Sequence, residues 1–382
     1  MLGSGLRAQL LRGGAGTALI QVTNRVLALA LGIVLARSLG ADGYGVYAYA
    51  FAIMSLLMVV AEAGVPTLLI REVATRQSRQ EWGLLRGALI RGSQFVAIVS
   101  TLVSVIGLAV LGTMAEGLSK ATLYTTVLML LVVPLAALGK TAAAAMRGLH
   151  HVVVGQAVDL LLRPAMVLAV VGSLFVAFPG IRQPQYAMAV QLGAALVVLI
   201  VAVVALQGFL PISTRTALAE YRTRQWLKSA APFLLIGGAG IIKNQTDIVM
   251  LGWFRDAREV GIYRVAMQGG VVVAFFLQAA SSVLAPHFAK MYIAKDIDRL
   301  RRLYRRATLL VLCASLPIAL MLMVFGGQVV SFTFGSEFRN AALPLSILSG
   351  GYLLSCDSAV SGVAGYWVLI CELGNEEGRT YY

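Results

Sequence analysis

The sequence predicts an all-α polytopic membrane protein in which two helical bundles form a parallel repeat around a central cavity. The first observation is composition, because hydrophobic residues make up 59% and charged residues 13% of the 382 residues, and the mean hydropathy is +0.84. Soluble globular domains approach about 25% charged residues. The second observation is a series of long apolar runs, and the third is an internal repeat.

The apolar runs are long enough to cross a bilayer, whose core about 30 Å thick needs a helix of roughly 20 residues. Runs bounded by charged residues, Gly or Pro give ten predicted spans, at residues 15–36, 44–69, 93–114, 121–139, 152–178, 185–210, 231–253, 261–285, 307–332 and 341–370. The short segments between them leave no room for a separate soluble domain.

Lys and Arg in the short loops predict that the N-terminus is cytoplasmic, since basic loops are retained on that side. With this orientation the inner segments hold 20 Lys and Arg residues, counting Lys140 at the border of the fourth span, and the outer segments hold 6. The basic run "DIDRLRRLYRR" at 296–306 then reads as a cytoplasmic loop lying on anionic headgroups, and a nucleic-acid partner is not expected despite the net charge of +14.

An internal repeat relates the segment after the first span to the segment after the seventh. "GYGVYAYA" at 43–50 resembles "EVGIYRVA" at 259–266, and Gly45, Tyr47 and Ala50 match Gly261, Tyr263 and Ala266 at a constant offset of 216. An offset of six helices makes both halves enter the membrane in the same direction. Such parallel repeats are typical of transporters with a site between the halves.

Several stretches resemble the polysaccharide-transporter branch of the MOP superfamily, which includes flippases for O-antigen and other lipid-linked oligosaccharides. They include "LARSLGADGYGVYAYAFAIMSLL" at 35–57, "TDIVMLGWFRDAREVGIYRVAMQ" at 246–268 and "FTFGSEFRNAALPLSILSGGYLLS" at 332–355. The resemblance implies two six-helix bundles that face each other across a cavity.

The end of the chain departs from this family pattern after about Cys356. We therefore expect an N-terminal six-helix bundle at 1–212, the first four helices of a C-terminal bundle at 213–356, and an atypical tail at 357–382. Truncation, a frameshift or divergence would each explain the tail. The second bundle is accordingly expected to be incomplete.

Polar residues inside the apolar runs are the candidate site, because charged groups in a span are costly unless they face a cavity or a partner. Within the spans five basic residues, Arg25, Lys140, Arg163, Lys243 and Arg264, oppose three acidic ones, Glu62, Asp159 and Asp247. Glu62 and Arg264 lie near span ends and are expected to reach the interface or bind a neighbouring helix. The predicted substrate-binding residues are Asn24, Arg25, Asp159, Arg163, Lys243, Asn244, Gln245 and Asp247.

Two pairs of these residues have a spacing that leaves a purely structural role open. Asp159 and Arg163, like Lys243 and Asp247, are four positions apart and share a helix face. Each couple could therefore neutralise itself within its helix and bind nothing. Arg25 differs, since no acidic residue lies three or four positions from it in the sequence.

A surplus of positive charge suits a phosphate or pyrophosphate group. With the resemblance, it implies a flippase for undecaprenyl-pyrophosphate-linked oligosaccharide in the bacterial cytoplasmic membrane, with lipids and a coupling proton or sodium ion as partners. The alternatives are a cation-coupled multidrug exporter of the same superfamily, which would need an acidic cavity, and a non-functional truncated remnant or membrane scaffold.

Enzymatic chemistry is not expected. His150, His151 and His287 have no nucleophile or carboxylate at useful spacing, and the "GGAG" pieces lack the Lys and Ser/Thr of a phosphate loop. Cys313, Cys356 and Cys371 lie in apolar runs without metal-ligand spacing and read as small apolar residues. No cofactor or metal is predicted.

The orientation can be tested by thiol accessibility. In a cysteine-free background, single cysteines placed in 71–92, 211–230 or 286–306 should resist a membrane-impermeant thiol reagent in intact cells. Cysteines at 182 and 256, in predicted outer loops, serve as positive controls. Labelling of the first three segments as efficient as at these controls would contradict the orientation and the repeat assignment with it.

Overall fold

The computed structural model describes residues 4–273, 291 and 297–353. The chain divides into two compact units, Met1–Gly261 and Ile262–Tyr382, called here unit 1 and unit 2. Every regular element within the described residues is helical. The predicted all-α membrane class is therefore confirmed.

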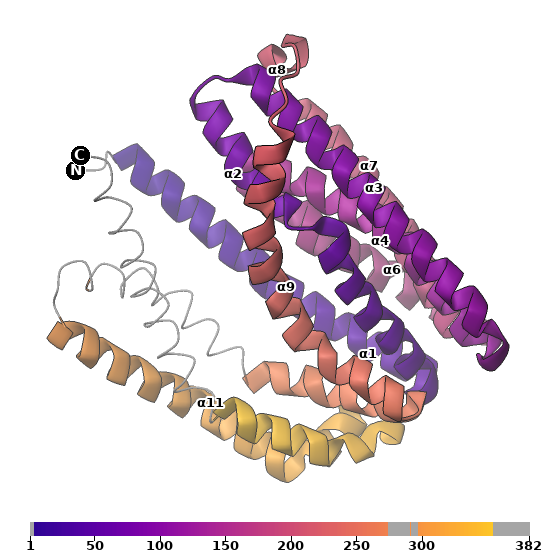
Figure 1. Cartoon of the computed structure of the whole chain (residues 1–382). Coiled ribbons are helices and arrows are strands. Elements are labelled where there is room, and N and C mark those ends of the chain that lie inside the picture. The colour runs from indigo at the N-terminus through magenta and orange to yellow at the C-terminus, as the bar shows by residue number, and fades with distance from the viewer. Residues whose placement is uncertain (1–3, 274–290, 292–296, 354–382) are drawn as a thin grey trace. The chain divides into compact units, whose positions relative to one another are not determined.

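Unit 1 is a bundle of long helices (Figure 1). Its α-helices are α1 (Ser4–Glu62), α2 (Val65–Ser78), α3 (Trp82–Met114), α4 (Lys120–Gly148), α5 (Val152–Ala157), α6 (Arg163–Ala177), α7 (Pro184–Phe209), α8 (Ile212–Thr216) and α9 (Thr223–Phe254). A π-helical segment, η2 (Val158–Leu162), joins α5 to α6, and short 3₁₀ turns lie at η1 (Ala115–Gly117) and η3 (Pro179–Ile181).

Helix α1 contains the first predicted span and most of the second, whose last residues, 65–69, belong to α2. Gly40 interrupts it with φ 67° and ψ −179°, a conformation that residues with a Cβ rarely adopt. The chain therefore turns at Gly40 from the first span into the second. This long element is one of six helices that are long and apolar enough to cross a membrane within the described residues.

The other predicted spans coincide with observed helices, and the spans 152–178 and 185–210 match them to within one residue, whereas several other helices extend further. α3, α4 and α9 begin or end about one to three turns beyond the apolar runs, and α11 (Ile297–Thr333) takes up part of the basic run predicted as a loop. Helix also covers 257–273 and 342–353, and the remainders of the eighth and tenth predicted spans lie outside the described residues. Hydropathy underestimates the length of these helices, because charged and small residues at their ends lower the hydropathy without ending the helix.

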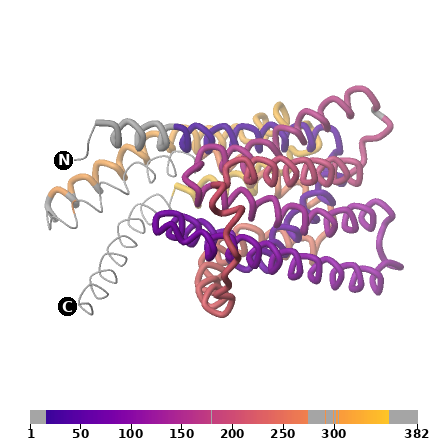
Figure 2. Tube along the Cα trace, turned by 90° about the horizontal axis from the view of Figure 1, so that it is seen from above, coloured from indigo at the N-terminus to yellow at the C-terminus, as the bar shows by residue number. Residues whose placement is uncertain are grey.

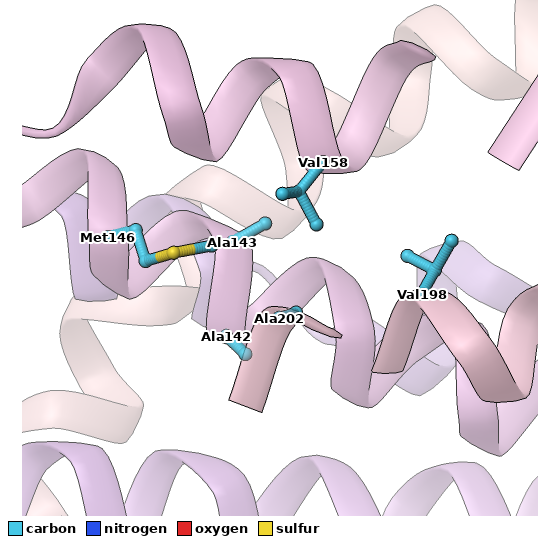
Figure 3. Packing of buried hydrophobic residues seen from close by; sticks show 6 residues of the cluster. All are labelled: Ala142, Ala143, Met146, Val158, Val198 and Ala202. Carbon is cyan, nitrogen blue, oxygen red and sulfur yellow. The ribbon is translucent and has the colours of Figure 1, made fainter. Parts of the chain in front are cut away.

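Helix α4 occupies the middle of unit 1 and packs against α1, α2, α3 and α7. Both views show α3, α4 and α7 running nearly side by side (Figures 1 and 2). One buried cluster joins α4, η2 and α7 and comprises Ala142, Ala143, Met146, Val158, Val198 and Ala202 (Figure 3). The three alanines among them let the helix backbones approach closely, as is typical of helix packing in membranes.

The outer face of unit 1 is apolar. Ile98 and Leu102 on α3 are 68% and 55% exposed, and Val204 on α7 is 63% exposed. A surface of this kind is matched to lipid chains and would be unfavourable in water.

At one end of the bundle, Arg76 on α2 binds Glu72 and Glu81. The hydrogen bond from Arg76 holds the pKa of the Glu81 carboxyl below its ordinary value.

Two matched residues of the repeat, Gly45 and Gly261, lie against each other within unit 1. A Cβ atom on Gly45 would overlap the carbonyl oxygen of Ala257 and lie 3.0 Å from the Gly261 nitrogen. A Cβ atom on Gly261 would overlap the carbonyl oxygen of Ala41 and lie 3.1 Å from the Gly45 nitrogen. Ala41 and Ala257 share the 216-residue offset, so the contact is reciprocal, as a repeat with approximate two-fold symmetry requires.

In unit 2, α11 is followed by the 3₁₀ turn η4 (Ser336–Ala341) and the helix at 342–353. Arg299, Arg302, Arg305 and Arg306 are exposed on the first turns of α11. Phe338 and Leu345 are buried, and a Cβ atom on Gly269 would lie 2.8 Å from the Leu345 side chain. Cys313 is exposed on α11, whereas Cys356, Cys371 and His287 lie outside the described residues.

The reciprocal glycine contact gives a stability prediction. Gly45→Ala should destabilise the protein by about 1–3 kcal/mol, because backbone on the facing helix must move to admit the methyl group. Gly112→Ala is the matched control, since a Cβ atom at Gly112 meets nothing within 4 Å. The melting temperature of purified protein in detergent measures both. An unchanged value for Gly45→Ala would contradict the close packing.

Candidate functional site

Five charged side chains gather inside unit 1, on α1, α4, η2 and α6. They are Glu62, Lys140, Arg147, Asp159 and Arg163, called here the interior charge cluster. Lys140 and Arg147 are seven positions apart on α4 and therefore lie on one face, about two turns from each other. The central helix of the bundle thus supplies two of the cations.

The strongest ion pair of the cluster joins α4 to the end of α1. Lys140 Nζ lies 2.8 Å from Glu62 Oε2, with the two side chains 35% and 11% exposed. The expectation that Glu62 binds a neighbouring helix is confirmed. The second carboxylate oxygen, Glu62 Oε1, is buried and accepts no hydrogen bond within the described part of the chain. It is therefore available to water or to a bound cationic group.

A second ion pair holds Asp159 to α4. Arg147 Nη2 lies 3.5 Å from Asp159 Oδ2, and the side chains are 18% and 15% exposed. Asp159 and Arg163 are four positions apart, but the π-helical turn Val158–Leu162 stands between them and alters the α-helical register. The ion pair of Asp159 is made to Arg147 on α4, although the charge of Arg163 still acts on it.

Arg163 begins a chain of polar contacts that reaches α1. Its Nε donates to Gln191 Oε1 at 3.2 Å, and Gln191 Nε2 donates to Tyr47 Oη at 3.1 Å. Gln191 and Tyr47 are 4% and 5% exposed. Arg163 Nη2 also lies 3.8 Å from the sulfur of Met54. These partners are neutral, so they orient the guanidinium without cancelling its charge.

The interior charge cluster has an excess of positive charge. Three cations, Lys140, Arg147 and Arg163, stand against the two carboxylates of Glu62 and Asp159. Arg147 Nε is buried without a hydrogen-bond acceptor among the residues described here. Such a site can accept an anionic group, because a buried guanidinium offers charged and directional donors.

The remaining predicted site residues lie on α1 and α9. Asn24 and Arg25 are half-buried on the first part of α1. On α9, Lys243, Asn244 and Asp247 are exposed, while Gln245 is half-buried and its Oε1 lacks a partner within the described ranges. α9 packs on the second part of α1, where Gly238 meets Val59 and Gly252 meets Tyr49. The role of these residues with a substrate stays a prediction.

Three residues of the site were not predicted from the sequence. Arg147 was assigned to a cytoplasmic segment, because the predicted span ended at residue 139, whereas α4 continues to Gly148. Gln191 and Tyr47 are uncharged and were not counted among the intramembrane candidates. A buried amide in an apolar run, and a tyrosine within the repeated motif, were the available signals. Arg264, expected near a span end, is half-buried at the start of unit 2.

The fold and the site define a multi-pass membrane transporter, and comparisons with known proteins agree. The family model described as polysaccharide biosynthesis protein matches residues 10–292, and a second model, MatE, matches residues 241–355. The chain therefore belongs to the polysaccharide biosynthesis protein family, in the polysaccharide-transporter branch of the MOP superfamily.

Individual relatives are distant. A probable low-salt glycan biosynthesis flippase of Haloferax volcanii is 21% identical over 156 residues, which are 41% of this chain and 33% of that protein. The match thus spans about a third of that relative's length.

Solved structures share the fold. An inward-facing multidrug resistance MATE family transporter has a TM-score of 0.67 at 14% identity. The superposition covers 91% of this chain and 83% of the transporter's chain. A MOP superfamily transporter from Pyrococcus furiosus, described by the reverse polarity of its binding pocket, has a TM-score of 0.53 at 14% identity, with 94% and 84% covered.

The Lys140–Glu62 pair gives a prediction on stability. Lys140→Met should lower stability because it leaves the Glu62 carboxylate buried without its cation; breaking a fully buried pair costs about 3–5 kcal/mol, and the partial exposure of Lys140 reduces this. Lys140→Met combined with Glu62→Leu should recover most of the loss. Thermal unfolding in detergent measures both variants. A double variant as unstable as the single one would show that the pair does not act as a unit.

Proposed function

We propose that this protein flips a lipid-linked oligosaccharide, carried on undecaprenyl pyrophosphate, across the bacterial cytoplasmic membrane for polysaccharide biosynthesis. The observation that carries the proposal is the excess of positive charge inside unit 1, where Lys140, Arg147 and Arg163 outnumber Glu62 and Asp159. Membership of a polysaccharide biosynthesis family supports it, and so does the likeness to a glycan biosynthesis flippase.

In this mechanism the charged and sugared head crosses through polar surface while the lipid tail stays in the bilayer. Arginines bind phosphate oxygens through paired N–H donors, and a lysine acts as a compact charge. Arg163 is held in place by Gln191, so its guanidinium is already oriented when a phosphate arrives. Asn24, Arg25, Lys243, Asn244, Gln245 and Asp247 contribute further polar contacts to the head.

The proposal includes the arrangement that moves the head. Two bundles, 1–212 and 213–356, alternate about a central path, and the N-terminus lies in the cytoplasm. A proton or a sodium ion is the coupling partner, and Glu62 Oε1, buried without a hydrogen-bond donor among the described residues, is a candidate position for it.

A cation-coupled multidrug exporter is the second candidate function. The fold favours it equally, because the structural neighbours include multidrug transporters. Electrostatics does not favour the exporter, because a cationic drug would meet a net positive charge in unit 1. A cation is attracted by negative charge and repelled by positive charge. The two functions therefore differ in the sign of the charge on the ligand that the interior of unit 1 would bind.

Complementation of a strain that lacks its own polysaccharide flippase tests the proposed function. Arg25→Ala should reduce surface polysaccharide at least about tenfold, because the proposed substrate head loses a cationic contact. The protein level should stay normal, because removing a charge from a span lowers the cost of membrane insertion. The double change Lys243→Ala with Asp247→Ala should do the same, and it avoids leaving Asp247 without the neighbouring cation.

The matched controls remove charges from exposed positions outside the interior of the spans. Arg79→Ala and Lys120→Ala are suitable, since both residues are exposed at helix ends. Full complementation by Arg25→Ala and by the double variant, at protein levels equal to the controls, would contradict a role of these residues with the substrate. Resistance to cationic dyes without any complementation would favour the exporter instead.

A further inference from the structure

A cavity at one end of unit 1 lies apart from the interior charge cluster and is not used by the transport mechanism. It lies between the first turns of α3, the last turns of α7 and the short helix α8, and its volume is about 400 Å³. Its polar lining consists of Arg86, Gln207, Thr214 and Arg215, and its apolar lining includes Leu89 and Leu210. Figure 1 shows α8 at the end of the bundle, beside α3 and α7.

The two arginines are fixed in place by backbone groups. Arg86 Nη1 donates to the carbonyl oxygens of Arg215 and Ala217 at 2.9 Å and 2.7 Å. Arg215 Nη2 donates to the carbonyl oxygen of Gln207. Since carbonyl groups orient a guanidinium but do not neutralise it, both positive charges remain at the cavity. Neither of these residues forms a salt bridge within the described part of the chain.

Thr214 supplies an independent indication of a ligand. Its side chain is 1% exposed and lines the cavity, yet Thr214 Oγ1 has no hydrogen-bond partner among the described residues. A buried hydroxyl without a partner costs about 1–3 kcal/mol, so such groups are normally satisfied by water or by a ligand. Beside two guanidinium groups, the matching acceptor is an anionic oxygen.

The surroundings of the cavity are amphipathic, with large exposed apolar side chains beside exposed polar ones such as Ser213 and Thr216. Ile212 and Leu218 in the segment around α8 are 79% and 89% exposed, and Val204 lies one helical turn from Gln207 on α7 and is 63% exposed. Large apolar side chains at this exposure fit acyl chains, and the polar side chains beside them suit the level of the lipid headgroups. Positive charge at the ends of spans attracts anionic lipid headgroups.

We propose that this cavity binds the phosphate headgroup of an anionic phospholipid, with Arg86, Arg215 and the Thr214 hydroxyl as donors and the acyl chains along α7 and α8. The bound lipid fastens the segment 210–222, which connects α7 to α9, to the start of α3. This inference does not depend on the proposed function, because any substrate is compatible with such a structural lipid.

Native mass spectrometry of the full-length protein in detergent tests the proposal, with phosphatidylglycerol or phosphatidylcholine added at equal concentration. The wild type should retain phosphatidylglycerol about tenfold better than phosphatidylcholine. Arg215→Gln should lower that preference to about twofold or less. Arg224→Gln removes the same charge from an exposed position at the start of α9 and should leave the preference unchanged.

Thr214→Val separates ligand binding from folding. Valine has nearly the shape of threonine and removes the hydroxyl that lacks a partner, so the melting temperature of delipidated protein should stay equal or rise. The increase in melting temperature on adding phosphatidylglycerol should nevertheless fall to less than half of the wild-type increase.

Three results would overturn the assignment. They are equal retention of the two lipids by the wild type, an equal loss of preference in Arg224→Gln and Arg215→Gln, and a full lipid-dependent shift in Thr214→Val. Inorganic phosphate that raises the melting temperature as much as phosphatidylglycerol, with the same dependence on Thr214, would assign the cavity to a soluble anion and also reject the lipid.

Discussion

The cost of placing charge inside a membrane protein is the constraint on which the rest of unit 1 depends. Lys140, Arg147, Asp159 and Glu62 can occupy the interior only because α1, α4 and η2 bring opposite charges within 2.8 Å and 3.5 Å of each other. These pairs fix the positions of helices that otherwise pack through alanine and valine. Two carboxylates leave one of the three cations unbalanced, and the proposed binding of an anionic head rests on that charge.

Close approach of helix backbones is the second requirement, and small residues meet it in two different ways. In the α4–α7 cluster, Ala142, Ala143 and Ala202 allow dense packing between the helices (Figure 3). At Gly45 and Gly261 the contact is local, and each glycine lies against the backbone of the other's helix. Because the two glycines face each other, a substitution at either one disturbs the same contact.

The sequence predicted the fold well where a single physical signal dominates. Apolar runs located the long helices, and three identities at one offset indicated a repeat whose members are in contact at Gly45 and Gly261. The interior site was harder to predict. Arg147 looked like a loop residue because hydropathy falls near helix ends, and the pair of Asp159 with Arg147 is a contact between helices that spacing along the chain does not show. Neutral Gln191 gained its role only through tertiary contact with Arg163 and Tyr47.

The π-helical turn Val158–Leu162 also affects how this chain can be compared with its relatives. A π turn holds about one residue more than an α turn, so everything after it is rotated by about 100° relative to an uninterrupted helix. A relative with a continuous α-helix here would place equivalent side chains one position earlier in its sequence. Correct alignment of Arg163 with such a relative therefore requires a single-residue gap inside a membrane span, where alignments are ordinarily kept free of gaps.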